Sequence, residues 1–140
     1  MGSEMCIRDR AKASLDDDRT FIVSGDEGLD ELSLAGGNSL AEVESGEVTM
    51  RRVDASAIGV PNAPLEAIRG DDAQFNAAGL TRLLDGEKSA YRDAVLLNAA
   101  GTLVVAGLTH DWPEAAAKAA EAIDSGAAKA LLAKWIELTV

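Results

Sequence analysis

The spacing of apolar residues changes near Gly70, and this change limits the possible folds more than any other feature of the sequence. Before Gly70, short β-branched or alternating runs at 20–24 and 48–52 are typical of strands, and an irregular strand is expected around 40–43. A proline-containing segment, 61–64, interrupts the pattern, and helical spacing follows. The order predicts an α/β fold in which a few strands are followed by about four helices.

The first two predicted helices carry clear end signals. Asp71 is a candidate N-cap with Gln74 three residues further on, and Gly86 suits the left-handed position that ends a helix. The second helix covers about 91–106 and is apolar on nearly all sides. A helix of that kind needs partners all round, so we expect it to be central.

The last two helices are predicted from a start signal and an apolar stripe. Asp111 and Pro113 open the third helix, which closes near 125–126. The fourth helix continues to about residue 138, and its spacing predicts a buried side made of Leu131, Leu132, Trp135 and Ile136.

Two or three short strands are too few for a sheet that buries this much helix, so the pattern favours a part of a larger domain. Residues 1–12 have no apolar period and are interpreted as a non-native lead-in, whereas 13–140 are interpreted as native sequence. The single cysteine, Cys6, lies in that lead-in. One cysteine allows neither an intrachain disulfide nor a cysteine-based zinc site, and a reducing, cytoplasmic setting is expected.

The charge of the chain argues against two classes of partner. The formal net charge is −11, and the sequence contains no basic cluster. Nucleic acids and anionic membranes both require positive surface, so neither is expected as a partner. The longest apolar run, 94–108, is shorter than the roughly 20 residues that span a membrane.

One stretch of the sequence has pronounced chemical character. Asp30 and Glu31 are adjacent carboxylates placed just beyond the first predicted strand. Ligands of open α/β sheets bind outside the carboxyl ends of strands, and adjacent acids on a turn can both reach Mg²⁺. From the residues alone, a solvated acidic turn is the simpler interpretation, and both interpretations stay open.

Several motifs, taken in order, resemble those of anthranilate phosphoribosyltransferases. A strand, a short glycine-containing turn and Gly-Leu-Asp-Glu form the most specific of them. The resemblance covers roughly 13–138 without large gaps, with Ser24 where the family often has histidine and with no proline near 55–56. The matching segments are 23–33, 54–59, 70–77, 84–88, 93–100 and 122–128.

The resemblance implies a fold, a reaction and a metal site. The chain would be the C-terminal part of a nucleoside phosphorylase/phosphoribosyltransferase-type catalytic domain. The implied reaction transfers 5-phosphoribosyl from phosphoribosyl pyrophosphate to anthranilate in tryptophan biosynthesis, and the full-length enzyme is expected to be a homodimer. Asp30 and Glu31 would bind the Mg²⁺ that contacts the donor pyrophosphate. The family's glycine-rich donor loop, its Lys-His-Gly-Asn segment and its anthranilate-contacting arginine do not occur in this sequence, so no catalytic residue is assigned.

The other polar and aromatic residues are interpreted as structural. Asn98 lies in an apolar helix and is expected to bond to the backbone of a neighbouring loop. His110 is expected at the surface, and Arg51 and Arg52 as solvated residues of an edge strand. Both tryptophans are expected to anchor packing.

Three other functions remain open at this level. A pyrimidine nucleoside phosphorylase relative would share the fold, and so would a non-catalytic paralogue that binds nucleic acid. An acidic helical domain without a site of its own is the third. The sequence upstream of residue 13 in the parent gene would distinguish them.

Overall fold

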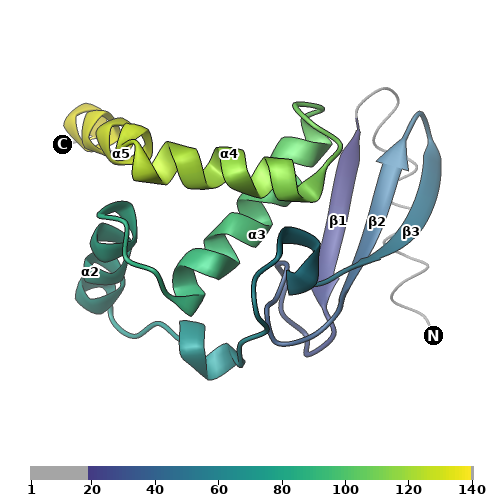
Figure 1. The fold of residues 1–140 in the computed structure, drawn as a ribbon, viewed down its shortest axis with the longest axis horizontal. Helices are drawn as coiled ribbons and strands as arrows, with labels where there is room; N and C mark the ends of the chain where they lie inside the picture. Colours follow the sequence, from purple (N-terminus) through teal and green to yellow (C-terminus); the bar gives the residue numbers. More distant parts are fainter. Residues whose placement is uncertain (1–18, 140) are drawn as a thin grey trace.

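The computed structural model describes residues 19–139 of the 140-residue chain, and the interpretation of 1–12 as a lead-in lies outside the described residues. In the described part, three strands come first and four α-helices follow, as predicted (Figure 1). The strands are β1 (Thr20–Gly25), β2 (Asn38–Glu44) and β3 (Glu47–Val53). Two 3-10 turns, η1 (Ala55–Ile58) and η2 (Leu65–Ile68), lead to α2 (Ala73–Leu84), α3 (Ala90–Val105), α4 (Trp112–Asp124) and α5 (Ala127–Thr139).

The strands form one antiparallel sheet in the order β1-β2-β3. The strand expected around 40–43 is present as β2, but it is regular and not irregular, because residues 38–43 pair with a neighbour on each side. Ser45 and Gly46 join β2 to β3 with φ angles of 50° and 74°. Two successive residues of positive φ are typical of the tight hairpin turn that matches the twist of paired strands, and this turn sets the β2–β3 register.

Helix α2 starts one residue later than the sequence predicted. The N-cap is Asp72, whose carboxylate accepts a hydrogen bond from the Phe75 amide at 2.8 Å. Asp71 instead exchanges two backbone hydrogen bonds of 3.0 Å with the side chain of Asn76. The capping box predicted between Asp71 and Gln74 is therefore wrong, because two adjacent acids compete for the same cap.

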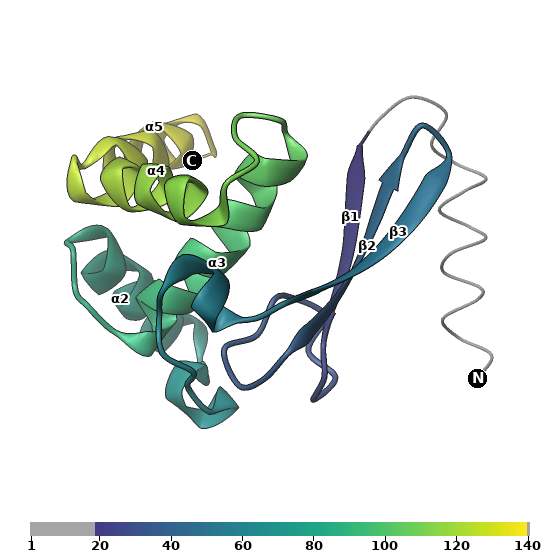
Figure 2. The ribbon, with the colours of Figure 1, turned by 45° about the vertical axis from the view of Figure 1, so that its right-hand side comes forward.

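Helix α3 is central, as its apolar sequence predicted. It contacts β1, η1, η2 and α4, and in Figure 2 it crosses between the sheet and the other helices. Asp111 caps α4 by accepting a 2.7 Å hydrogen bond from the Glu114 amide, and Pro113 occupies its first turn, both as predicted. None of the helices within residues 19–139 is long and apolar enough to cross a membrane.

The predicted buried side of α5 is exposed. Leu131, Trp135 and Ile136 retain 68%, 66% and 51% of their accessible surface, and Leu132 is half-buried. Among the described elements, α5 packs mainly against α4 (Figure 1), and Lys129 of α5 forms an ion pair with Asp85 at the end of α2. An apolar stripe predicts that a helix face needs a partner, but the stripe does not say where the partner is. Trp135 is therefore not a packing anchor in this structure, whereas Trp112 packs against the core.

We expect the chain to self-associate through this exposed face of α5, since contiguous exposed apolar surface drives association. Trp135→Ala should weaken the self-association by about 2 kcal/mol, or roughly 30-fold, as expected for removing a central aromatic contact. Leu108→Ala is a matched control, because Leu108 is 65% exposed but lies between α3 and α4. Sedimentation velocity across protein concentrations gives the measurement, and a strictly monomeric wild-type chain would contradict the expectation.

Candidate metal-binding site

The loop between β1 and β2 holds the predicted carboxylate pair. Asp30 and Glu31 are both exposed on it, beyond the carboxyl end of β1. The Gly25 amide donates to the Leu29 carbonyl at 2.8 Å, and the Gly28 amide donates to the Gly25 carbonyl at 3.0 Å. Gly28 has a φ of 92°, which favours glycine. The loop thus folds back immediately after the strand, and both carboxylates lie beyond the carboxyl end of β1.

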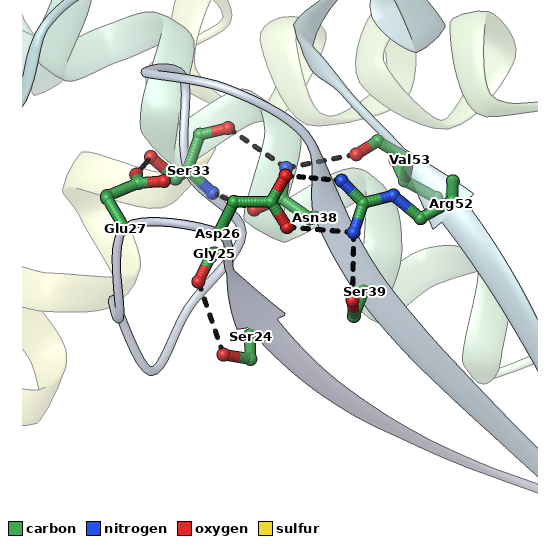
Figure 3. Close-up of polar contacts among 9 residues, drawn as sticks. All are labelled: Ser24, Gly25, Asp26, Glu27, Ser33, Asn38, Ser39, Arg52 and Val53. Carbon is green, nitrogen blue, oxygen red and sulfur yellow. Dashed lines mark hydrogen bonds and ion pairs between the residues drawn. The ribbon is translucent and has the colours of Figure 1, made fainter. Parts of the chain in front are cut away.

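An ion pair fixes the start of this loop (Figure 3). Both guanidinium amino groups of Arg52, on β3, donate to the Asp26 carboxylate, one of them at 2.8 Å, and that group also donates to Ser39 Oγ at 2.9 Å. These hydrogen bonds lower the pKa of Asp26, with a smaller opposing effect from burial. Arg52 was expected only as a solvated edge residue, and no pattern in the sequence indicates its partner.

Asn38 fixes the end of the loop (Figure 3). Its Oδ1 accepts from the Ser33 amide at 2.7 Å, and its Nδ2 donates to the carbonyls of Ser33 and Val53 at 3.0 and 3.1 Å. Asn38 is fully buried, and Ser33 also donates a side-chain hydrogen bond to Glu27. The same asparagine therefore ties the loop to both β2 and β3.

Asn98 ties the same loop to α3. Its Oδ1 accepts from the Leu32 amide at 3.0 Å, and its Nδ2 donates to the Leu32 carbonyl at 2.8 Å. The prediction that Asn98 bonds to a neighbouring loop backbone is confirmed. One turn along α3, a Cβ on Gly101 would lie 3.2 Å from Leu32 Cδ1, so the missing side chain lets Leu32 pack closely on the helix.

The donor set of Asp30 and Glu31 fits Mg²⁺ that is shared with a phosphate ligand. Mg²⁺ prefers oxygen ligands and commonly binds through one or two carboxylates plus substrate phosphates and water. Within residues 19–139, no hydrogen bond or ion pair occupies either carboxylate, and no group of three or more His, Cys, Asp or Glu side chains could hold a metal. The pair would therefore supply part of the coordination, and water or the oxygen atoms of a phosphate ligand would complete it.

A second group of charges lies away from this loop. Glu42 on β2 is 8% exposed and accepts hydrogen bonds from Arg19 at 2.6 and 2.8 Å and from Arg51 at 2.7 Å. Arg19 also donates to the Val104 carbonyl near the end of α3 at 2.8 Å. Arg51 is thus exposed, as expected, but paired. His110 is exposed, also as expected.

Glu42 should make the stability of the fold depend on pH. Burial raises its pKa, but the hydrogen bonds and charges of Arg19 and Arg51 outweigh burial, so the pKa lies below the ordinary 4.5. A carboxyl whose pKa is lower in the folded chain stabilises the fold above pH 4.5, and this contribution is lost as pH falls through the folded pKa.

Glu42→Gln should therefore cost about 2 kcal/mol of unfolding free energy at pH 7, because it leaves two arginines without their shared anion. The difference from the wild type should shrink as pH falls below 4.5. Urea unfolding at pH 7 and at a pH below 4.5 measures the difference in unfolding free energy between the two proteins. Glu44→Gln, at the exposed end of β2, should have little effect. A Glu42→Gln difference that stays the same at low pH would be inconsistent with this ion pair.

The sequence of the chain matches one protein-family model over most of its length. Residues 7–129 match the model of the family described as "Glycosyl transferase family, a/b domain". The chain belongs to this glycosyl transferase family.

Within this family, the chain is similar to anthranilate phosphoribosyltransferases, so the resemblance expected from the sequence is confirmed. The protein of that name from Erythrobacter litoralis is 61% identical over 130 residues, which are 93% of this chain and 39% of the relative. Its counterpart from Novosphingobium aromaticivorans is 58% identical over 119 residues, 85% of this chain and 36% of the relative. The chain therefore spans less than two fifths of the length of these relatives.

Solved structures of the same enzyme share the fold. Anthranilate phosphoribosyltransferase from Thermus thermophilus superimposes with a TM-score of 0.76 at 38% identity, covering 85% of this chain and 35% of that chain. The Saccharomyces cerevisiae enzyme in complex with PRPP and Mg gives a TM-score of 0.71 at 27% identity, covering 77% of this chain and 31% of that chain. The architecture of strands followed by helices is thus that of part of a known catalytic domain.

Proposed function

We propose that this chain is the C-terminal part of an enzyme that transfers 5-phosphoribosyl from phosphoribosyl pyrophosphate to anthranilate. The bond from ribosyl C1 to the pyrophosphate oxygen breaks, and a bond from C1 to the anthranilate nitrogen forms. The products are phosphoribosylanthranilate and pyrophosphate, and the amine loses a proton. The observation that carries the proposal is an exposed Asp30–Glu31 pair at the end of β1, in a chain 61% identical to a relative of that name.

In this proposal, Asp30 and Glu31 hold a divalent cation at the carboxyl end of β1. When bound, Mg²⁺ offsets the negative charge that gathers on the pyrophosphate leaving group. The chain's own contribution is to fix the position of the two carboxylates that hold the cation. Its loop backbone is held at Leu29 and at Leu32, on either side of the pair.

Three further features are part of the proposal. The Saccharomyces cerevisiae enzyme has been solved in complex with PRPP and Mg and, separately, with 4-fluoroanthranilate, which supports the same substrates here. The net charge of −11 supports small-molecule substrates rather than nucleic acid as the partner. We place the whole enzyme in the cytoplasm and expect it to be a homodimer.

A chimera tests the proposal. The 130 matched residues of the Erythrobacter litoralis relative are replaced by those of this chain, and formation of phosphoribosylanthranilate is followed by its fluorescence. We expect turnover within about tenfold of the parent relative, because the chain then supplies the carboxylates and the relative supplies the rest of the site. A chimera that folds and binds donor but has no turnover would refute the proposed function.

A further inference from the structure

We propose that Asn98 and Asn38 are positioning residues for the metal-binding carboxylates: the two asparagines clamp Leu32 and Ser33 and so preset the backbone that carries Asp30 and Glu31. This inference rests on the proposed metal role of the pair. It adds two residues, from α3 and from β2, that do not touch the metal or the substrate.

The hydrogen bonds bracket the pair on both sides. The Leu29 carbonyl, directly before Asp30, accepts from the Gly25 amide at 2.8 Å. Leu32, directly after Glu31, has its amide and its carbonyl both bonded to Asn98, at 3.0 and 2.8 Å. Only the two carboxylate-bearing residues lie between these fixed points, so their backbone can vary little.

Ser33, the next residue, is bonded in the same way by Asn38 of β2. Asn38 bonds its amide at 2.7 Å and its carbonyl at 3.0 Å (Figure 3). Each asparagine side chain thus bonds the amide and the carbonyl of one residue, as a neighbouring strand would. These two backbone groups would otherwise be buried without partners. Two consecutive residues held by different elements give the loop one conformation relative to the sheet and to α3.

The amide chemistry points to positioning and not to ligand contact. A side-chain amide has two N–H donors. Asn98 uses them on the carbonyls of Leu32 and Ala94, at 2.8 and 3.0 Å. Asn38 uses them on Ser33 and Val53. Neither asparagine has a donor left for a substrate, so each acts through the loop.

Packing supports the same role for Asn98. Leu32 is 3% exposed and belongs to the core cluster that includes Leu97. Asn98 and Gly101 lie three residues apart on one face of α3, and that face receives both the backbone and the side chain of Leu32. The loop is therefore fixed by a buried side chain as well as by hydrogen bonds.

The test compares metal binding in the whole chain and in an Asn98→Ala variant. The probe is Mn²⁺ alone, which takes the same oxygen ligands and broadens nearby amide resonances. We expect Asn98→Ala to raise the Mn²⁺ concentration that half-broadens the Asp30 and Glu31 amides by about tenfold, the usual effect of removing a residue that orients a metal ligand. The amides of Glu44 and Glu47, which face each other across β2 and β3, serve as the internal reference.

Asn76→Ala is the matched control. Asn76 makes the same pair of hydrogen bonds to the backbone of one residue, Asp71, at 3.0 Å each, but it does so at the start of α2. It should leave Mn²⁺ binding at Asp30 and Glu31 within about twofold of the wild type, because it does not orient a metal ligand. The control thus separates the general effect of losing such an asparagine from the loss of positioning of the two carboxylates. If Asn98→Ala does not fold, Asn98→Ser, which can keep one of the two hydrogen bonds, should give a smaller shift in the same direction.

The outcomes distinguish this inference from the proposed function. Asp30→Asn with Glu31→Gln should abolish the local broadening. If that double variant behaves like the wild type, both the metal role and this inference fail. If the double variant loses binding but Asn98→Ala, Asn98→Ser and an Asn38→Ala variant all bind Mn²⁺ as the wild type does, the positioning role alone is overturned.

Discussion

Asp30→Asn with Glu31→Gln should lower the turnover of the chimeric enzyme by roughly 100-fold or more, a loss typical of removing one electrostatic stabiliser of a transition state. The double substitution removes two charges and keeps the side-chain shapes, so it removes the cation and little else. The fold should persist, because both side chains are exposed and neither carboxylate takes part in a hydrogen bond or ion pair within residues 19–139.

The control for this prediction removes the same amount of charge elsewhere. Glu44→Gln with Glu47→Gln acts at the β2–β3 hairpin, at the opposite end of β2 from the carboxylate loop. Its turnover should stay within about twofold of the unsubstituted chimera, since exposed charges at that distance are screened by salt. Equal turnover in all three proteins would leave Asp30 and Glu31 without a role in the reaction.

The chain by itself should catalyse no measurable phosphoribosyl transfer, and this is the largest contrast that we expect. Its match covers 39% of the Erythrobacter litoralis relative, and the glycine-rich donor loop and anthranilate-contacting arginine that the resemblance implies for the whole enzyme do not occur in its sequence. Holding both reactants together supplies much of an enzyme's rate, and two carboxylates cannot do so alone. Turnover by the purified 140-residue chain with donor, Mg²⁺ and anthranilate would show that the chain holds more of the site than we infer.

The fold could be predicted wherever local patterns decide it. The strand at 20–24 and the start of α4 at Asp111 were found from β-branched runs and capping residues. The start of α2 was missed by one residue, because Asp71 and Asp72 are chemically equivalent as caps. The exposure of Trp135 could not be predicted, since an apolar stripe reports the need for a partner and not its presence.

The sequence could predict the part of the site whose residues are adjacent in the chain, but not the contacts between residues far apart. Asp30 and Glu31 stand next to each other in the sequence, and a resemblance to a known family implied a role for them. The Asp26–Arg52 ion pair joins residues that are 26 positions apart in the sequence, and no sequence pattern indicates it. Asn98 was expected to bond to a loop, because a buried amide must find partners, but only the fold shows that the loop carries the carboxylates.

The most direct measurement is the Mg²⁺ dependence of turnover in the chimera, with and without the double substitution of Asp30 and Glu31. If the pair holds the cation, the half-saturating Mg²⁺ concentration rises in the substituted chimera. Excess Mg²⁺ then restores part of the lost rate, because a weakened site refills by mass action. An unchanged half-saturating concentration with an unchanged rate would contradict a metal role and leave an ordinary solvated acidic turn.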